Sequence, residues 1–190
     1  MTTLDLHTAT LDELRADVSA RTGRGINAII AGIGLWTVFA ILGLVIRNEF
    51  VLALCYVFGS GLLFPLSLLV AKAMRLDTYA KGNGLGTLAG IIGSVQILFI
   101  PLMVGAILLL PAAVPWFLAV LVGAHFLPFS WLFASRAYVF AAVSIPVAAG
   151  LVGLLLPAIV PVAVPLTVVV LLAVTAIGLA RANAADTAHG

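Results

Sequence analysis

The sequence predicts an all-α polytopic membrane protein, in which six transmembrane helices form one bundle. Three observations predict this fold: 64% of the 190 residues are hydrophobic, only 8% are charged, and the apolar residues gather in long uninterrupted runs. Soluble domains are roughly 45–50% apolar and about 25% charged. A water-soluble globule of this composition would lack the polar side chains to cover its surface, so the apolar runs must face lipid.

Each apolar run is long enough to cross the hydrocarbon core of a bilayer, which is about 30 Å thick and takes about 20 helical residues. The segments between the runs hold charged residues, Gly or Pro, which commonly end helices. The third run is interrupted by Pro101, which we expect to leave the Ile97 carbonyl without its helical donor. The predicted spans are residues 26–46, 50–71, 85–110, 116–134, 137–156 and 160–180, and together they make a transmembrane domain over residues 26–181.

The basic residues predict the direction of the chain, because cytoplasmic loops of membrane proteins are enriched in Lys and Arg. If the six spans alternate, eight of the nine basic residues fall on one side: Arg15, Arg21, Arg24, Lys72, Arg75, Lys81, Arg136 and Arg181. Only Arg47 falls on the other side, next to Glu49. We therefore expect the N-terminus and the C-terminus in the cytoplasm.

The two terminal segments are expected to be cytoplasmic. Residues 1–25 are predicted to form an amphipathic helix, because Thr10 and Glu13 match a capping box and Leu11, Leu14 and Val18 share one helix face. A frayed tail is the alternative for this segment. Residues 182–190 are predicted to form a cytoplasmic tail.

No Asp, Glu, Lys or Arg lies inside the apolar runs. This argues against carboxylate-driven ion exchangers, aspartyl intramembrane proteases and membrane metalloenzymes with acidic ligands, which all need such groups. A few polar or amphipathic side chains do lie at mid-depth, about 15 Å from each surface: His125, Gln96, Ser60, Trp36 and Thr37. Because an unpaired polar group is costly in hydrocarbon, we expect His125 and Gln96 to face the bundle interior and bond to each other, to Ser60 or to water.

Three interpretations of His125 stay open: a hydrogen-bonded packing element, part of a site for a ligand or a proton, and a catalytic base. Catalysis is the least favoured, because Gly59-Ser60-Gly61 is not a nucleophile-elbow pattern and no third group would orient the histidine. The single Cys55 has no partner at metal-ligand spacing. We therefore expect no enzymatic activity, no cofactor and no metal site.

Other residues mark the cytoplasmic face and a helix contact. Lys72 and Arg136 follow the second and fourth spans at that face. Gly82, Gly86 and Gly90 recur at four-residue spacing, which favours close helix packing within the chain or with a second copy. Because the basic residues stand at span ends and do not form one face, nucleic acid is not an expected partner.

Residues 123–132 read Gly-Ala-His-Phe-Leu-Pro-Phe-Ser-Trp-Leu and are soon followed by Ser135-Arg136-Ala137-Tyr138. This stretch resembles a motif in a family of small, uncharacterised bacterial six-helix membrane proteins. Glu13-Leu14-Arg15 and Gly25, ahead of the first span, extend the similarity. The resemblance implies a bacterial plasma (inner) membrane protein. Because the family has no assigned function, the resemblance does not indicate an activity.

The leading functional prediction is a small transporter or ligand-binding membrane protein with its site in the His125–Gln96 layer. The first alternative is a non-catalytic assembly or partner subunit that uses the glycine face. An intramembrane enzyme is less favoured. The expected partners are the lipid bilayer, a small-molecule ligand and a second copy of the chain.

Overall fold

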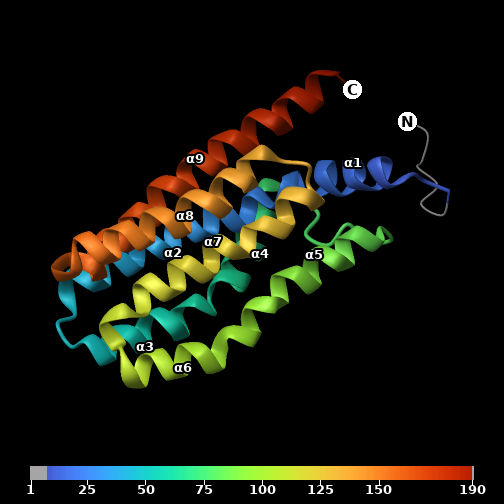
Figure 1. Ribbon diagram of the computed structural model, residues 1–190. Helices are drawn as coiled ribbons and strands as arrows, with labels where there is room; N and C mark the ends of the chain where they lie inside the picture. The colour runs from blue at the N-terminus through green and yellow to red at the C-terminus, as the bar shows by residue number, and fades with distance from the viewer. Residues whose placement is uncertain (1–7, 190) are drawn as a thin grey trace.

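A computed structural model describes residues 8–189, and the elements in that range are helical throughout (Figure 1). Five helices are long and apolar enough to cross a membrane, or six if a bent pair of helices counts as one span. The predicted all-α class is confirmed, and the protein is a multi-pass membrane protein.

The first, fourth and fifth spans begin and end within two residues of the predicted positions. The α-helices are α1 Leu11–Thr22, α2 Ile26–Val45, α3 Glu49–Ser60, α4 Leu63–Met74, α5 Gly84–Ser94, α6 Ile100–Leu109, α7 Val114–Leu132, α8 Arg136–Leu155 and α9 Val160–His189. Four short 3-10 turns join them: η1 Gly23–Gly25, η2 Val95–Phe99, η3 Pro111–Ala113 and η4 Pro157–Ile159.

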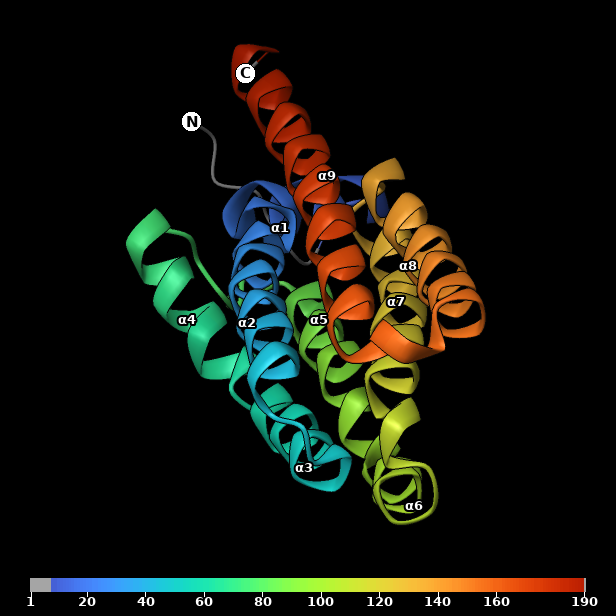
Figure 2. The ribbon, with the colours of Figure 1, turned by 90° about the vertical axis from the view of Figure 1, so that its left-hand side faces the viewer.

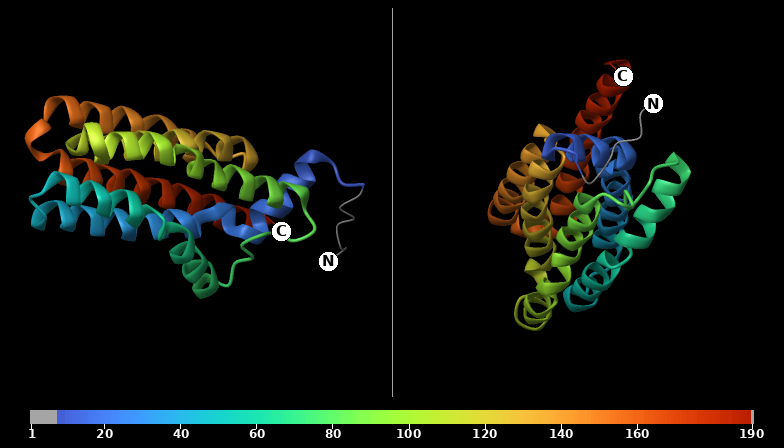
Figure 3. Two further views of the ribbon diagram at one scale, coloured as in Figure 1. Left: turned by 90° about the horizontal axis from the view of Figure 1, so that it is seen from below. Right: turned by 90° about the vertical axis from the view of Figure 1, so that its right-hand side faces the viewer.

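The predicted second span, residues 50–71, is two helices in the structure. α3 and α4 meet at an angle of 44°, and Figure 3 shows α4 leaving the direction of the bundle. The break has a local cause, because Pro65 has no N–H to donate to the Gly61 carbonyl four residues earlier. α4 packs along α2, where the Asn27 amide donates to the Ser67 carbonyl at 3.0 Å.

The predicted third span, residues 85–110, is also interrupted, but before Pro101 and not at it. The turn η2 separates α5 from α6, and Pro101 occupies the first turn of α6, where a missing N–H costs nothing. The expectation that Pro101 leaves the Ile97 carbonyl free is wrong, because that carbonyl accepts the Ile100 N–H.

The predicted tail, residues 182–190, is helical as far as His189, and Gly190 lies outside the described residues. Its alanines are strong helix formers. Arg24 anchors it, donating to Asn183 and to Asp186 at 2.6 Å each. Sequence alone could not show this anchor, which joins residues about 160 positions apart in the chain.

The expected capping box of α1 is confirmed: Thr10 and Glu13 bond to each other's backbone N–H groups, at 3.4 and 2.7 Å. Its expected apolar face is only partly right. Val18 is fully buried, Leu14 is half-buried, but Leu11 is 49% exposed. Residues 1–7 of the predicted segment 1–25 lie outside the described residues.

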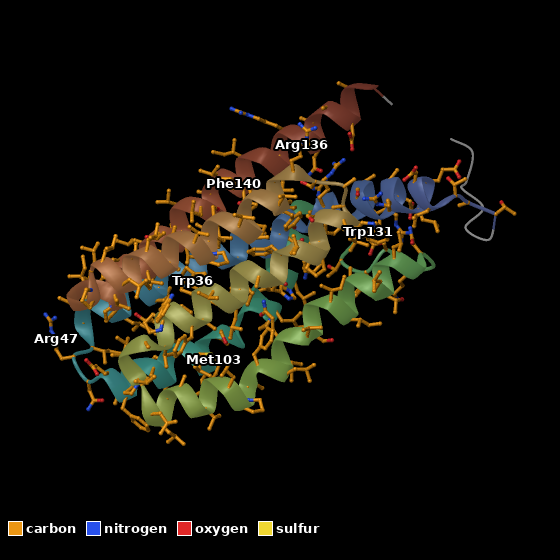
Figure 4. The ribbon with its side chains drawn as sticks, in the orientation of Figure 1. Trp36, Arg47, Met103, Trp131, Arg136 and Phe140 are labelled. Carbon is orange, nitrogen blue, oxygen red and sulfur yellow. The ribbon has the colours of Figure 1, made fainter. Side chains whose placement is uncertain are left out.

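The core forms where α9 packs along α2 and α8, and α8 packs along α7 (Figure 2). Trp36, which lies mid-span and far from either interface, is buried in this core against Phe39. α1, the 75–83 loop, the α7–α8 turn and the end of α9 gather at one end of the bundle, which we call the basic end (Figures 1 and 4). Arg47 lies at the opposite end.

Candidate functional site

Irregular backbone lies at mid-depth beside α7. The α3–α4 break at residues 61–62 and the turn η2 each fall near the midpoint of their span. Both α3 and η2 pack against α7, the helix that carries His125 and Pro128. Two spans that pack against α7 are thus interrupted at mid-depth.

His125 is half-buried, and two aromatic rings of its own helix lie beside its imidazole. The Phe129 ring lies edge-on to it at a centroid distance of 5.3 Å, and the Phe126 ring lies at 6.3 Å. Within residues 8–189 neither imidazole nitrogen has a hydrogen-bond partner. The ring is therefore held by aromatic packing, and both nitrogens are available to another molecule.

The other four predicted layer residues lie in different surroundings. Gln96 is half-buried on η2, and its amide has no hydrogen bond to the part of the chain that is described. Ser60 donates its proton to the Val57 carbonyl of its own helix at 2.6 Å, so the expected donation to His125 or Gln96 is not made. Trp36 turns into the core, and Thr37 is exposed and donates to the Ile33 carbonyl. The structure packs η2, which carries Gln96, against α7, which carries His125, and it leaves Thr37 exposed on the surface of α2.

The predicted glycine face lines an open groove of about 490 Å³ on α5 at the basic end. Gly82, Gly86 and Gly90 all lie in its wall, with Ser94. Gly86 serves the fold itself, because a Cβ there would lie 2.3 Å from the Tyr79 carbonyl oxygen. A Cβ at Gly90 would meet nothing within 4 Å, so this position of the groove is open.

A second pocket of about 400 Å³ lies where the α7–α8 turn meets α9. Arg136, one of the two predicted basic-face residues, lines it together with Arg24 and Ser135. Lys72, the other, is exposed on α4 and lies outside this pocket. Sequence reasoning did not find Arg24 and Ser135, because only the fold brings the start of the chain to α8 and α9. The signal in the sequence that could have pointed to this pocket was Ser135 directly before Arg136, the first residue of α8.

A family profile matches residues 11–182, from the first residue of α1 to within the last turns of α9. The chain belongs to DUF7010, a family of unknown function. The DUF7010 match covers most of the chain, so the resemblance read from residues 123–138 is confirmed as far as membership of an uncharacterised family. No curated protein and no solved structure matches this DUF7010 protein. Its function must therefore be argued from its own geometry.

Proposed function

We propose that this DUF7010 protein is a small transporter or ligand-binding protein, with its site in the mid-depth layer around His125 and Gln96. The observation that carries the proposal is the interruption of two spans near their midpoints, beside the helix that holds His125. Transporters commonly bind their substrates near the bilayer midplane at such broken helices. Irregular backbone at this depth is otherwise rare, because hydrocarbon supplies no hydrogen-bond partners.

The side chains at this layer favour a small, uncharged, polar ligand. The imidazole of His125 offers a donor and an acceptor, and the Gln96 amide offers both as well. No carboxylate, lysine or arginine lies in the apolar runs to compensate a ligand charge. The Phe126 and Phe129 rings beside His125 would cover the apolar part of such a ligand.

The proposed role is not catalytic. The Ser60 hydroxyl, the nucleophile that the sequence suggests beside His125, donates its hydrogen bond to the Val57 carbonyl. We place the protein in a bacterial plasma membrane with both termini in the cytoplasm, a proposal that rests on the distribution of basic residues and on the span-four motif.

The proposal is tested by asking whether water reaches His125. In a Cys55→Ser background, we expect His125→Cys to react with a charged thiosulfonate reagent added to membranes. Leu127→Cys is the matched control, because Leu127 lies on the same helix and is 56% exposed on the bundle surface, where lipid surrounds it. A thiol in acyl chains stays protonated and unreactive, so Leu127→Cys should not be labelled.

Equal lack of reaction at both positions would contradict a water-accessible site. A second measurement addresses ligand binding: His125→Phe keeps the aromatic packing against Phe129 but removes both nitrogens. Any uncharged polar solute that raises the thermal unfolding temperature of the wild type should lose that effect in His125→Phe. A solute that stabilises both proteins equally binds elsewhere.

The groove on α5 favours a second candidate function, self-association as an assembly subunit. α5 and α6 form the least buried of the candidate spans, and glycines in a membrane helix let a second backbone approach closely. Gly90→Leu would fill the groove from a position where an added Cβ meets nothing within 4 Å, so loss of dimers in cross-linking would report the contact itself. Gly105→Leu on α6 is the control, because a Cβ there also meets nothing within 4 Å. Monomeric wild-type protein in bilayers would rule this candidate out.

A further inference from the structure

The pocket between the α7–α8 turn and α9 contains a serine hydroxyl that has no hydrogen-bond partner among the described residues. Ser135 is only 8% exposed and lines this pocket. It precedes α8 in the N-cap position, yet its side chain makes no capping hydrogen bond. Among the described residues its hydroxyl has no other partner either. A polar side chain in a residue this well buried is normally hydrogen-bonded, and the pocket that Ser135 lines leaves room for a ligand atom to complete that bond.

The backbone next to Ser135 offers further donors. The first N–H groups of an α-helix have no partner inside the helix, and they carry the positive end of its dipole. In α8 this first turn has no acidic residue and no side-chain cap. Arg136 and Ala137 of this turn line the pocket. Together with the hydroxyl of Ser135, these groups suit the oxygens of a phosphate.

The charges around the pocket favour a single negative charge. Arg136 is exposed at the pocket and forms no ion pair within residues 8–189. Arg24 also lines the pocket, but its guanidinium is already paired with Asp186 at 2.6 Å. The charge of Arg24 is thus compensated and the charge of Arg136 is not. The pocket therefore has one positive charge to pair with the single negative charge of a phosphodiester.

The remaining wall is mostly apolar and runs along α8 and α9, away from the basic end. Phe140 lies one helical turn past Arg136 on α8 (Figure 4), and Val174 faces the same pocket from α9. Both side chains are exposed at the bundle surface. A polar head between arginines and an apolar wall running into the membrane together fit an amphipathic molecule.

We propose that this pocket binds an anionic phospholipid, with the phosphodiester at Ser135, Arg136 and the first turn of α8. An acyl chain then lies along Phe140 and Val174. The position agrees with the membrane: α8 starts at the basic end of the bundle, where the headgroups of one leaflet lie. Phosphatidylglycerol carries one net negative charge and fits this site, whereas the ammonium group of phosphatidylcholine would meet Arg136.

The test is native mass spectrometry of the detergent-purified protein with equal amounts of phosphatidylglycerol and phosphatidylcholine. The wild type should retain phosphatidylglycerol preferentially. Arg136→Gln removes a charge-assisted hydrogen bond and should weaken retention about tenfold, and Ser135→Ala should weaken it about threefold. Lys72→Gln is the matched control, because Lys72 is an exposed cation at the same end and lies outside the pocket, so it should change nothing. Unchanged unfolding temperatures without lipid would show that each variant is folded.

Three outcomes would overturn the proposal. Equal retention of both lipids would show that the pocket does not select for an anion. An equal loss with Lys72→Gln and Arg136→Gln would show that only the overall charge of this end attracts lipid. Inorganic phosphate that displaces phosphatidylglycerol at equal concentration would assign the site to free phosphate.

Discussion

At the scale of single residues, Tyr56 supplies a hydrogen-bond donor that a proline removes from α9. Pro165 has no N–H, so the Pro161 carbonyl four residues earlier lacks its helical donor. The Tyr56 hydroxyl, from α3, donates to this carbonyl at 2.6 Å and also lies 3.1 Å from the Phe39 carbonyl. Tyr56 is 1% exposed, so no water replaces it. The contact joins three spans near the Arg47 end.

We expect Tyr56→Phe to destabilise the protein by about 1 kcal/mol, because the Pro161 carbonyl is then left without a donor in an apolar environment. Thermal unfolding in detergent measures the change. Tyr79→Phe removes a hydroxyl from a tyrosine that is exposed at the basic end, and it should leave the unfolding temperature unchanged. Equal stability of Tyr56→Phe and the wild type would show that the hydrogen bond contributes nothing.

Gly43 is required by the same contact. A Cβ at Gly43 would lie 2.2 Å from the Pro161 carbonyl oxygen and 3.0 Å from the Tyr56 hydroxyl, so α2 and α9 must separate in Gly43→Ala. We expect a loss of about 1–3 kcal/mol, as for other overpacked sites. Gly34→Ala lies on the same helix, where an added Cβ meets nothing within 4 Å, and serves as the control. A stable Gly43→Ala would mean that the two helices can separate at no cost.

At the scale of elements, polar contacts hold α1 against the 75–83 loop. Arg21 donates to Asp77 at 2.5 Å, and the Asn83 amide donates to Asp17 at 2.9 Å. α1 also reaches α7, where Arg15 stacks on the Trp131 ring and donates to the Trp131 carbonyl. α1 is thus fixed to the basic end mainly by charge and hydrogen bonds, which explains why Leu11 remains exposed.

This attachment should weaken in acid. The backbone N–H of Tyr79, followed by the Arg21 side chain, lowers the pKa of Asp77 below its ordinary value of 3.8. A carboxyl with a depressed pKa stabilises the folded state above the ordinary value and loses this contribution as the pH falls through the folded pKa. The protection factor of the α1 amides, which is the ratio of the intrinsic to the observed exchange rate at the same pH, should therefore be high at neutral pH and fall well below pH 3.8.

Asp77→Asn separates this effect from general acid unfolding. The variant should show low protection factors in α1 at neutral pH, with little further change in acid. Asp12→Asn is the control, because the Asp12 carboxylate is highly exposed and pairs, among residues 8–189, only with Arg15, at 3.6 Å. If α1 exchanges equally fast in the wild type and in Asp77→Asn, the Arg21–Asp77 pair does not hold it.

The sequence predicts the ends of most spans, because charges and prolines must lie outside the hydrocarbon. It does not predict the breaks at residues 61–62 and 95–99, since helices in membranes tolerate Gly and Pro when neighbouring segments satisfy the backbone. For the candidate site, counting residues gives the depth of His125 and Gln96. It cannot give the rotation of α2, because a helix that is apolar all round does not mark its inner face. Trp36 and Thr37 were both assigned to the candidate layer, although one is buried and the other exposed.

At the scale of the whole molecule, the α3–α4 pair decides the topology. The 75–83 loop after α4 bonds to α1 at the basic end, whereas Arg47, just before α3, lies at the opposite end (Figure 4). The bent pair therefore runs from one end of the bundle to the other. This arrangement favours six crossings, which would bring the first and last described helices, α1 and α9, to the same side of the membrane.

Cysteine labelling tests this topology in intact cells, in a Cys55→Ser background. We expect a membrane-impermeant maleimide to label Arg47→Cys directly, and to label Lys81→Cys and Ala184→Cys only after the membrane is permeabilised. All three positions are exposed, so reactivity reports the side of the membrane and not burial. If α3 and α4 instead entered and left on the same side, the chain would cross five times. Lys81→Cys and Ala184→Cys would then be labelled together with Arg47→Cys in intact cells.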